Sequence, residues 1–177
     1  MPTPRTITTT LRRIPTVEGA GVRLQREFGA ADPRFDPFLL LDDFGSDDPA
    51  DYLAGFPWHP HRGIATVTYV LAGEVVHVDS MGNRGVIRSG GVQWMSAGSG
   101  LIHQEMPQRY DGFMRALQLW VNLPAAQKMT PPRYHEVEAA SIPEAIPAAG
   151  VRVRVIAGEV AGALGPFSGM TDAYAWG

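Results

Sequence analysis

The sequence contains no cysteine, which excludes disulfide scaffolds, zinc ribbons, iron–sulfur clusters and thiol nucleophiles. Any metal must therefore be held by His, Asp or Glu. Purely aliphatic runs reach only three residues, as at 39–41, far short of the roughly 20 that span a bilayer. The opening residues also lack the apolar core of a signal peptide. These absences predict a soluble cytoplasmic protein that does not enter a membrane.

The charged residues form no basic block or stripe. Lysine and arginine number 15 against 18 aspartates and glutamates, which gives a net charge of −3. A protein that binds nucleic acid presents a concentrated basic surface to the phosphates. Direct binding of nucleic acid is therefore not expected.

Glycine and proline are abundant, with 20 and 15 residues among 177. This composition disfavours helical bundles and long coiled coils, because both residues destabilise helix interiors. Hydrophobic residues make up 45% of the chain, which is too many for a disordered protein. We expect an all-β fold with little helix, an antiparallel sandwich or small barrel of about ten short strands.

Runs of β-branched and alternating apolar residues locate the expected strands. Strand signals occupy residues 6–14, 17–29, 38–41, 64–80, 86–106, 113–123 and 151–160. Residues 72–74 divide one of these stretches into a hairpin, and residues 81–85 contain a further turn.

Two segments are expected to lie outside the strands. Four aspartates form an acidic patch that we expect to be a solvated loop, as charge clusters usually are. They are Asp42, Asp43, Asp47 and Asp48. Residues 124–150 contain five prolines and many alanines, which predicts a linker or surface wrap with one helical turn near Ser141.

Two pairs of ligand-type side chains share a spacing of two residues. His59 and His61 flank a proline, and His103 and Glu105 flank a glutamine. Residues i and i+2 of a strand point to the same face, so each pair presents its side chains together. Either pair alone is as well explained by ordinary surface or core residues. Together, beside Gly-rich and Pro-rich turns, they predict three imidazoles and one carboxylate around a divalent transition metal.

Three neighbouring features have simpler interpretations. Pro60 cannot donate to a strand ladder, so its strand is expected at a sheet edge or at a strand start. His77 alternates with valines after the hairpin, and we interpret it as a structural residue or one that supports a metal ligand. His135 follows the Pro-rich segment and is expected on the surface.

These residues resemble the cupins, and among them the pirin family. The similarity covers most of residues 35–135 and lies in four stretches. They read PFLLLDDF (37–44), GFPWHPHRGIATVTYVLAGEVVHVDSMGNRG (55–85), GGVQWMSAGSGLIHQEMP (90–107) and LQLWVNLP (117–124). The resemblance implies a cupin fold, a jelly-roll-like double-stranded β-helix. It also implies a metal, most often iron, on His59, His61, His103 and Glu105, a donor set that suits Ni, Mn, Co, Cu or Zn as well.

The sequence departs from the general cupin pattern at two places. That pattern has a Glu separated from the second His by three or four residues, where this chain has Ala65 and Thr66, and pirins usually have Glu at the first. Without that Glu, the fourth ligand of the general cupin pattern is absent, and Glu105 is needed in its place. A hydrogen bond near the metal is also expected to be lost. The second motif lacks a proline at Ala97, and the glycine before His103 is displaced by one residue.

The resemblance implies one of two functions, and the first is an oxidoreductase. Some bacterial pirins resemble quercetin dioxygenases, which open a flavonol ring with O2. The metal would bind the substrate oxygen as a Lewis acid, and Glu105 would act as the general base. A flat aromatic substrate would lie against Phe38, Phe56, Trp58 and Trp120, which are otherwise explained as core residues.

The second function is a non-enzymatic regulatory module. In such a protein the state of the metal would control binding to a protein partner. A wide cavity that leads to an open coordination position favours the enzyme. A closed site favours the module.

The resemblance also predicts the domain organisation, because pirins contain two cupin domains. We expect an N-terminal metal-binding domain at residues 1–135, a Pro/Ala-rich linker at 136–150 and the start of a truncated second domain at 151–177. An apolar patch that the rest of the second domain would cover is then expected to be exposed, or to be buried in a dimer.

Overall fold

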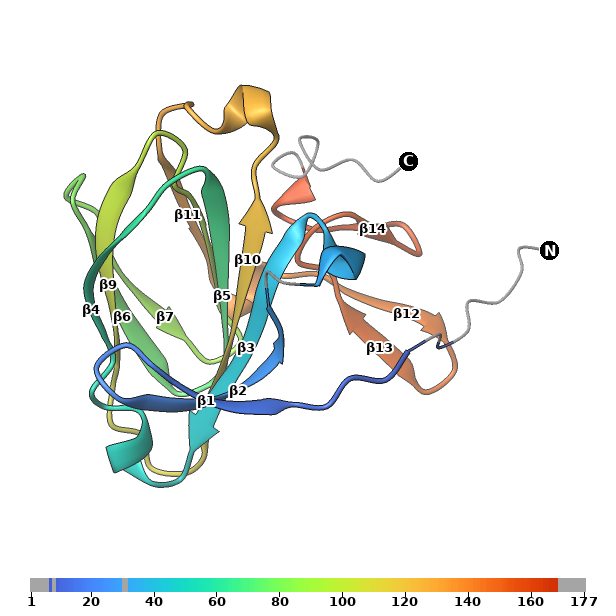
Figure 1. Cartoon of the computed structure of the whole chain (residues 1–177). Coiled ribbons are helices and arrows are strands. Elements are labelled where there is room, and N and C mark those ends of the chain that lie inside the picture. Colours follow the sequence, from blue (N-terminus) through green and yellow to red (C-terminus); the bar gives the residue numbers. More distant parts are fainter. Residues whose placement is uncertain (1–6, 8, 30–31, 169–177) are drawn as a thin grey trace.

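The computed structural model describes residues 7, 9–29 and 32–168, and these residues form an all-β structure (Figure 1). Their helical segments are single 3-10 turns. These are η1 (Pro33–Phe35), η2 (Pro49–Asp51), η3 (Ala125–Gln127) and η4 (Ala139–Ser141). No helix in this part of the chain is long and apolar enough to cross a membrane. The prediction of an all-β class with little helix is confirmed.

Two antiparallel sheets form opposite walls of a barrel (Figure 1). The larger has the order β1-β2-β3-β10-β5-β8-β11, and the smaller has the order β4-β9-β6-β7. The larger sheet consists of β1 (Ile14–Glu18), β2 (Val22–Phe28), β3 (Phe38–Ser46), β5 (Ile64–Ala72), β8 (Val92–Ser96), β10 (Met114–Asn122) and β11 (Arg133–Val137). The smaller sheet consists of β4 (Phe56–His61), β6 (Glu74–Asp79), β7 (Arg84–Arg88) and β9 (Leu101–Pro107).

The interior between the sheets is part apolar and part polar. Its apolar cluster consists of Val22, Leu24, Phe44, Tyr52, Val70, Val75, Ile87, Met114 and Ala116. Buried polar side chains of the same strands and their neighbours include His61, Thr66, Thr68, His77, His103 and Glu105. Because burying a polar group is costly unless it has a partner, this polar part is where a site is expected.

A second apolar cluster covers the outer face of the larger sheet. Ala65, Val67 and Trp94 of β5 and β8 pack there against Ile142 and Phe167, which follow the barrel in the sequence. The rings of Trp94 and Phe167 lie 5.6 Å apart between centroids. With both faces covered, β5 is buried over most of its length, and its inward face carries the polar Thr66 and Thr68.

Several expected local features are confirmed. Residues 72–74 form the β5–β6 hairpin, in which Gly73 has a φ of +99°, a conformation that glycine adopts without strain. The turn between β6 and β7 lies within residues 80–83, and β10 occupies the long stretch predicted near residues 113–123. β4, which contains Pro60, is an edge strand of the smaller sheet.

The prediction of an opening strand at residues 6–14 is wrong for the described part of that stretch. Residues 7 and 9–13 form no strand, and β1 begins only at Ile14. Strand propensity alone does not set where the first strand begins. The first strand is β1, which pairs with β2 in a hairpin, and the last residue pair of that hairpin is Ile14↔Arg26.

The acidic patch divides into two parts, and the solvated-loop prediction is wrong for the first. Asp42 and Asp43 lie in β3 with exposed fractions of 5% and 7%. Each is buried beside a bidentate arginine, Arg26 for Asp42 and Arg115 for Asp43. Paired charges of this kind can be buried where single ones cannot. Asp47 and Asp48 are exposed as predicted.

The Pro/Ala-rich stretch at 124–150 is more regular than a linker. The predicted helical turn near Ser141 is η4, and the stretch also contains β11. The stretch also contains β12 (Glu144–Ala148), which pairs with β13 (Val151–Arg154) just after it. A further two-stranded sheet is formed by β14 (Glu159–Val160) and β15 (Ala163–Leu164). The domain division at residues 135 and 150 stays a prediction, and its first boundary falls inside β11.

Candidate metal centre

Two neighbouring strands of the smaller sheet carry the predicted ligand pairs. β4 and β9 are antiparallel, and their register places His59 directly opposite His103. His59 and His61 share one face of β4 while the intervening proline points away, and His103 and Glu105 share one face of β9. The alternation of buried and exposed side chains turns both pairs toward the barrel interior, where the three histidines meet. The four-ligand set that includes Glu105 stays a prediction.

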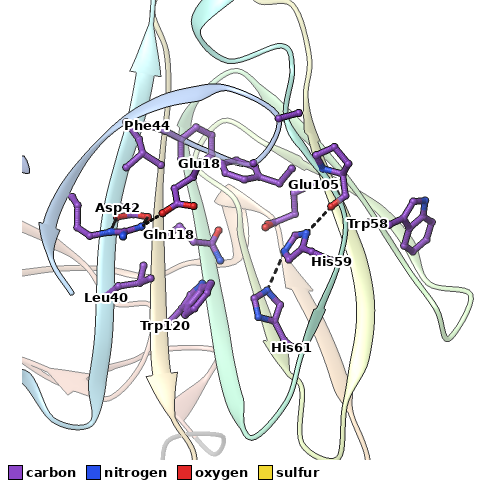
Figure 2. Close-up of a pocket in the computed structure, with 16 residues that line it drawn as sticks. Glu18, Leu40, Asp42, Phe44, Trp58, His59, His61, Glu105, Gln118 and Trp120 are labelled. Carbon is purple, nitrogen blue, oxygen red and sulfur yellow. Dashed lines mark hydrogen bonds and ion pairs between the residues drawn. The ribbon is translucent and has the colours of Figure 1, made fainter. Parts of the chain in front are cut away.

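The three histidines form a compact cluster, called here the histidine cluster (His59, His61 and His103). Their ligand atoms all lie within 4.8 Å of one another. His59 Nε2 and His61 Nε2 are 3.1 Å apart (Figure 2). Two imidazole nitrogens that share a metal ion at about 2.1 Å lie about 3.0 to 3.4 Å apart, depending on the angle between them. The spacing therefore suits two ligands of one ion.

The buried histidines are in the neutral form that a metal requires. Burial lowers the pKa of His61 to about 4 and that of His103 to about 2. His103 Nε2 is fully buried and has no hydrogen-bond partner among the residues that the structure describes. An unpaired buried nitrogen is costly unless something binds it. The residues thus fit a divalent transition metal, for which neutral imidazole is a common ligand.

Hydrogen bonds at the second ring nitrogen orient two of the histidines. His59 Nδ1 lies 2.7 Å from the carbonyl oxygen of Pro57, so it carries the proton and leaves Nε2 free. His103 Nδ1 lies 2.8 Å from His77 Nε2, and the same tautomer leaves His103 Nε2 free when Nδ1 donates. Such contacts hold a ligand ring in place. His77 is fully buried, stacks on Tyr134 and contacts His103, which agrees with its predicted supporting role.

Glu105 lies beside the histidine cluster in a buried position. Its carboxylate points toward His59 in Figure 2, and Thr68 Oγ1 lies 2.7 Å from its Oε1. Burial raises the pKa of Glu105 to about 7, and the hydrogen bond from Thr68 opposes that shift. Glu105 is outside the group of ligand atoms within 4.8 Å of one another, which among the described residues contains only the three histidines. A carboxyl with this pKa is able to exchange a proton near neutral pH.

A pocket of about 580 Å3 opens onto this site between the two sheets. His59, His61 and Glu105 form one end (Figure 2). Trp120 of β10 stands edge-on to His61, with ring centroids 4.9 Å apart. Gln118, two residues earlier on the same strand, also lines the pocket. A pocket of this size is within the range that binds small molecules.

Three of the four aromatic residues predicted for the pocket line it, namely Phe56, Trp58 and Trp120. The fourth prediction, Phe38, is wrong. A β-bulge in the β3–β10 pairing lies between Trp120↔Leu40 and Val121↔Phe38, so the alternation of faces changes at this point. Phe38 therefore packs with Val121 in the outer cluster.

The expected effect of Ala65 on the site is also wrong. Ala65 is fully buried in the outer cluster with Val67 and Trp94, on the face of β5 away from the histidines. A glutamate at position 65 would therefore point away from the histidines, whereas the other position, Thr66, is buried on the opposite face of β5. His135 is exposed on β11, as predicted.

Sequence reasoning missed one end of the pocket. Glu18, Arg26 and Asp42 line it opposite the histidine cluster, and Gln118, which contacts the buried Thr68, also lines it. One signal was available, because Asp42 alternates with the apolar Leu40 and Phe44 and so shares their buried face.

Comparison with known proteins agrees with this architecture. The pirin family model matches residues 21–121. A pirin-like protein from Caulobacter vibrioides is 54% identical over 157 residues, which cover 88% of this chain and 57% of that protein. The crystal structure of quercetin 2,3-dioxygenase from Acinetobacter baumannii superposes with a TM-score of 0.77 at 39% identity, covering 89% of this chain and 57% of that one. The bacterial pirin YhhW from Escherichia coli, in complex with nickel(II), has a TM-score of 0.57 at 28% identity and covers 75% and 57%.

The share of each chain that these matches cover shows how this chain is related to the known proteins. The chain spans about half the length of the curated relatives that it matches. The family model covers more than half of the chain, and the expected cupin fold is shared with the solved structures. The chain belongs to the pirin family.

Proposed function

We propose that the protein is a metal-dependent oxidoreductase that opens the ring of a flavonol such as quercetin with O2. The observation that carries the proposal is the open pocket of about 580 Å3 that ends at the histidine cluster. A non-enzymatic module that responds only to the state of its metal needs no cavity of this kind. The similarity to the Acinetobacter baumannii quercetin 2,3-dioxygenase supports the same conclusion.

In this proposal His59, His61 and His103 hold the metal, with Glu105 as the fourth ligand. Nitrogen and carboxylate donors suit several first-row divalent ions. Iron is the ion that the family resemblance implies, and the Escherichia coli relative was solved with nickel(II). When bound, the ion supplies Lewis acidity at the oxygen of the substrate.

The residues of the chain have three tasks in the reaction. Glu105 takes the proton of the flavonol hydroxyl when it is not bound to the ion, because burial places its pKa in the metal-free protein at about 7. Thr68 holds the Glu105 carboxylate through its hydroxyl. The apolar side chains of Leu40, Phe44 and Trp120 orient the planar rings and exclude water from the reacting end.

The test is an activity assay with quercetin. Protein loaded in turn with Fe, Ni, Mn, Co, Cu or Zn is mixed with quercetin and O2, and the loss of the flavonol absorbance is followed. The reaction balances when each flavonol consumes an equimolar amount of O2 and releases an equimolar amount of carbon monoxide. Turnover that is lost in Glu105→Gln supports the proposal, whereas no turnover with any of these ions contradicts it. A cytoplasmic location, a protein partner and a dimer stay predictions of the sequence.

A further inference from the structure

The end of the pocket opposite the histidine cluster is charged. Glu18 of β1, Arg26 of β2 and Asp42 of β3 line it, and the apolar side chains of Leu40 and Trp120 lie between this end and the histidines (Figure 2). A ligand that fills the pocket therefore meets polar groups at both ends and, between them, apolar side chains together with Gln118.

Arg26 and Asp42 form a bidentate ion pair with each other. They are direct partners in the β2–β3 register, and Arg26 Nε and Nη2 donate to the two Asp42 oxygens, each at 2.8 Å. The hydrogen bond to Asp42 is the main cause that raises the pKa of Arg26, so the guanidinium stays charged. A bidentate pair of this kind forms a fixed wall, and among the described residues only the Nη1 N–H groups of Arg26 are left without an acceptor.

Glu18 is the member of this end that has an oxygen without a hydrogen-bond donor. Its Oε1 accepts from Arg26 Nη2 at 3.0 Å, and its Oε2 has no hydrogen-bond partner within the described ranges of the chain. The Glu18 side chain is 44% exposed, so it reaches both the pocket and solvent.

The hairpin tip after Glu18 holds that residue over the pocket. The Ala20 N–H donates to the Gly55 carbonyl oxygen at 3.0 Å, which fastens the β1–β2 tip to the start of β4. Gly19 has a φ of +57°, and a Cβ at this position would lie 2.4 Å from the same oxygen. The close approach requires glycine and leaves the tip little freedom to move.

The charges at this end determine what it binds. Two carboxylates face one guanidinium whose Nε and Nη2 donors are engaged, so the end offers hydrogen-bond acceptors and a net negative charge. A carboxylate or phosphate group on a ligand would be repelled, whereas a hydroxyl would donate to Glu18 Oε2.

We propose that Glu18 is a specificity-determining residue that binds a hydroxyl group at the end of the substrate remote from the metal. This inference rests on the proposed function and narrows its substrate class to flat aromatic compounds that carry hydroxyls at both ends. Glu18 takes no part in the chemistry, so it acts on substrate binding.

The experiment measures binding and needs no turnover. Protein loaded with nickel(II) and kept free of O2 is titrated with quercetin and with 3-hydroxyflavone, a flavonol that has no hydroxyl on either outer ring. The wild-type protein is expected to bind quercetin about tenfold more tightly, the scale of one hydrogen bond to a charged group. Glu18→Gln keeps an oxygen for Arg26 but removes the charge, and is expected to weaken quercetin binding several-fold while binding of 3-hydroxyflavone is unchanged.

A matched control is Glu74→Gln, because Glu74 is also about half exposed and paired with one arginine, Arg88, but lies outside the pocket. This variant is expected to bind both flavonols as the wild type does. Equal affinities of the wild type for the two flavonols, or equal losses of both in Glu18→Gln, overturn the role of Glu18 and leave the proposed function standing. If neither flavonol binds, both proposals are overturned. If the binding preference holds but no turnover occurs with O2, only the proposed reaction is overturned.

Discussion

The Thr68 hydroxyl lies 2.7 Å from Glu105 Oε1 and so joins the larger sheet to the buried carboxyl of the smaller one. The same hydroxyl lies 2.8 Å from Gln118 Oε1. A hydroxyl has one proton and cannot donate to both oxygens. Two arrangements allow both contacts to be hydrogen bonds. In one, Glu105 is protonated and donates to Thr68, which donates to Gln118. In the other, Thr68 donates to Glu105, and Gln118 turns its amide nitrogen toward Thr68 and donates to it. The protonation of Glu105 is therefore coupled to the group that Gln118 presents to the pocket.

Replacing Thr68 by valine is expected to raise the pKa of Glu105 above its value of about 7. Burial raises this pKa and the Thr68 hydrogen bond lowers it, so the variant loses the opposing effect. The measurement is a pH titration of the carboxyl infrared band in the metal-free protein, with Glu105→Gln to identify the band. Thr68→Ser keeps the hydroxyl and is expected to titrate near the wild-type midpoint. Equal midpoints in Thr68→Val and the wild type would show that the hydroxyl has no influence on the carboxyl.

The affinity for a divalent metal is expected to rise with pH up to about 7 and then to level off. Below its pKa of about 7, Glu105 is protonated in the metal-free protein, and a metal that binds it must displace this proton. His61 and His103 have pKa values of about 4 and 2, so they stay neutral over the same range. The expected loss approaches tenfold per pH unit below the pKa of Glu105.

The control for this prediction is Glu105→Gln, which has no proton to release. Its metal affinity, measured by competition with a chromophoric chelator, is expected to be lower near neutral pH and to lose the contribution of Glu105 to the pH dependence. A Glu105→Gln variant with the pH dependence of the wild type would contradict both the pKa of Glu105 and its place among the ligands.

The parts of the site that were predictable from the sequence depend on local geometry. His59 and His61 share a face because strands alternate with a period of two, and the same holds for His103 and Glu105. A proline between the first two marks the sheet edge. These features require only the spacing within one strand.

The parts that were not predictable depend on pairing between distant strands. The bulge that turns Phe38 to the outer face arises in its register with Val121 of β10. The burial of Asp42 depends on Arg26, which lies 16 residues away on β2. Neither the register nor the partner can be read from the strand that contains the residue, because both are set when the sheet assembles.

The metal-free protein is expected to lose stability on acidification. Burial lowers the pKa of His61 and His77 to about 4 and that of His103 to about 2, from a usual value of 6.5. Lowered pKa values contribute stability that is present above pH 6.5 and is lost as the pH falls toward the folded-state values. Glu105 has a raised pKa, so its contribution runs the opposite way and is lost as the pH rises from 4.5 through 7.

The contribution of the three histidines to the free energy of unfolding is larger than the opposite contribution of Glu105. The free energy of unfolding is therefore expected to fall toward low pH, by on the order of a few kcal/mol at about pH 4. Urea unfolding of the metal-free protein at a series of pH values measures the slope. Glu105→Gln removes the opposing contribution and is expected to steepen the loss on acidification. A free energy of unfolding that is constant between about pH 7 and pH 4 would contradict the neutral, buried state of the histidines.

His61→Ala is expected to abolish metal retention, whereas His135→Ala retains the metal. His61 supplies one of three nitrogens that lie within 4.8 Å of one another, and its loss leaves two imidazoles, one of which keeps an unpaired buried nitrogen. His135 is exposed on β11 and belongs to no cluster of ligand atoms among the described residues, so it is a matched control for the removal of a histidine. Elemental analysis of the purified variants, with circular dichroism to verify folding, measures the occupancy. Full occupancy in a folded His61→Ala protein would show that the metal is held elsewhere, because two imidazoles do not complete a site built on three.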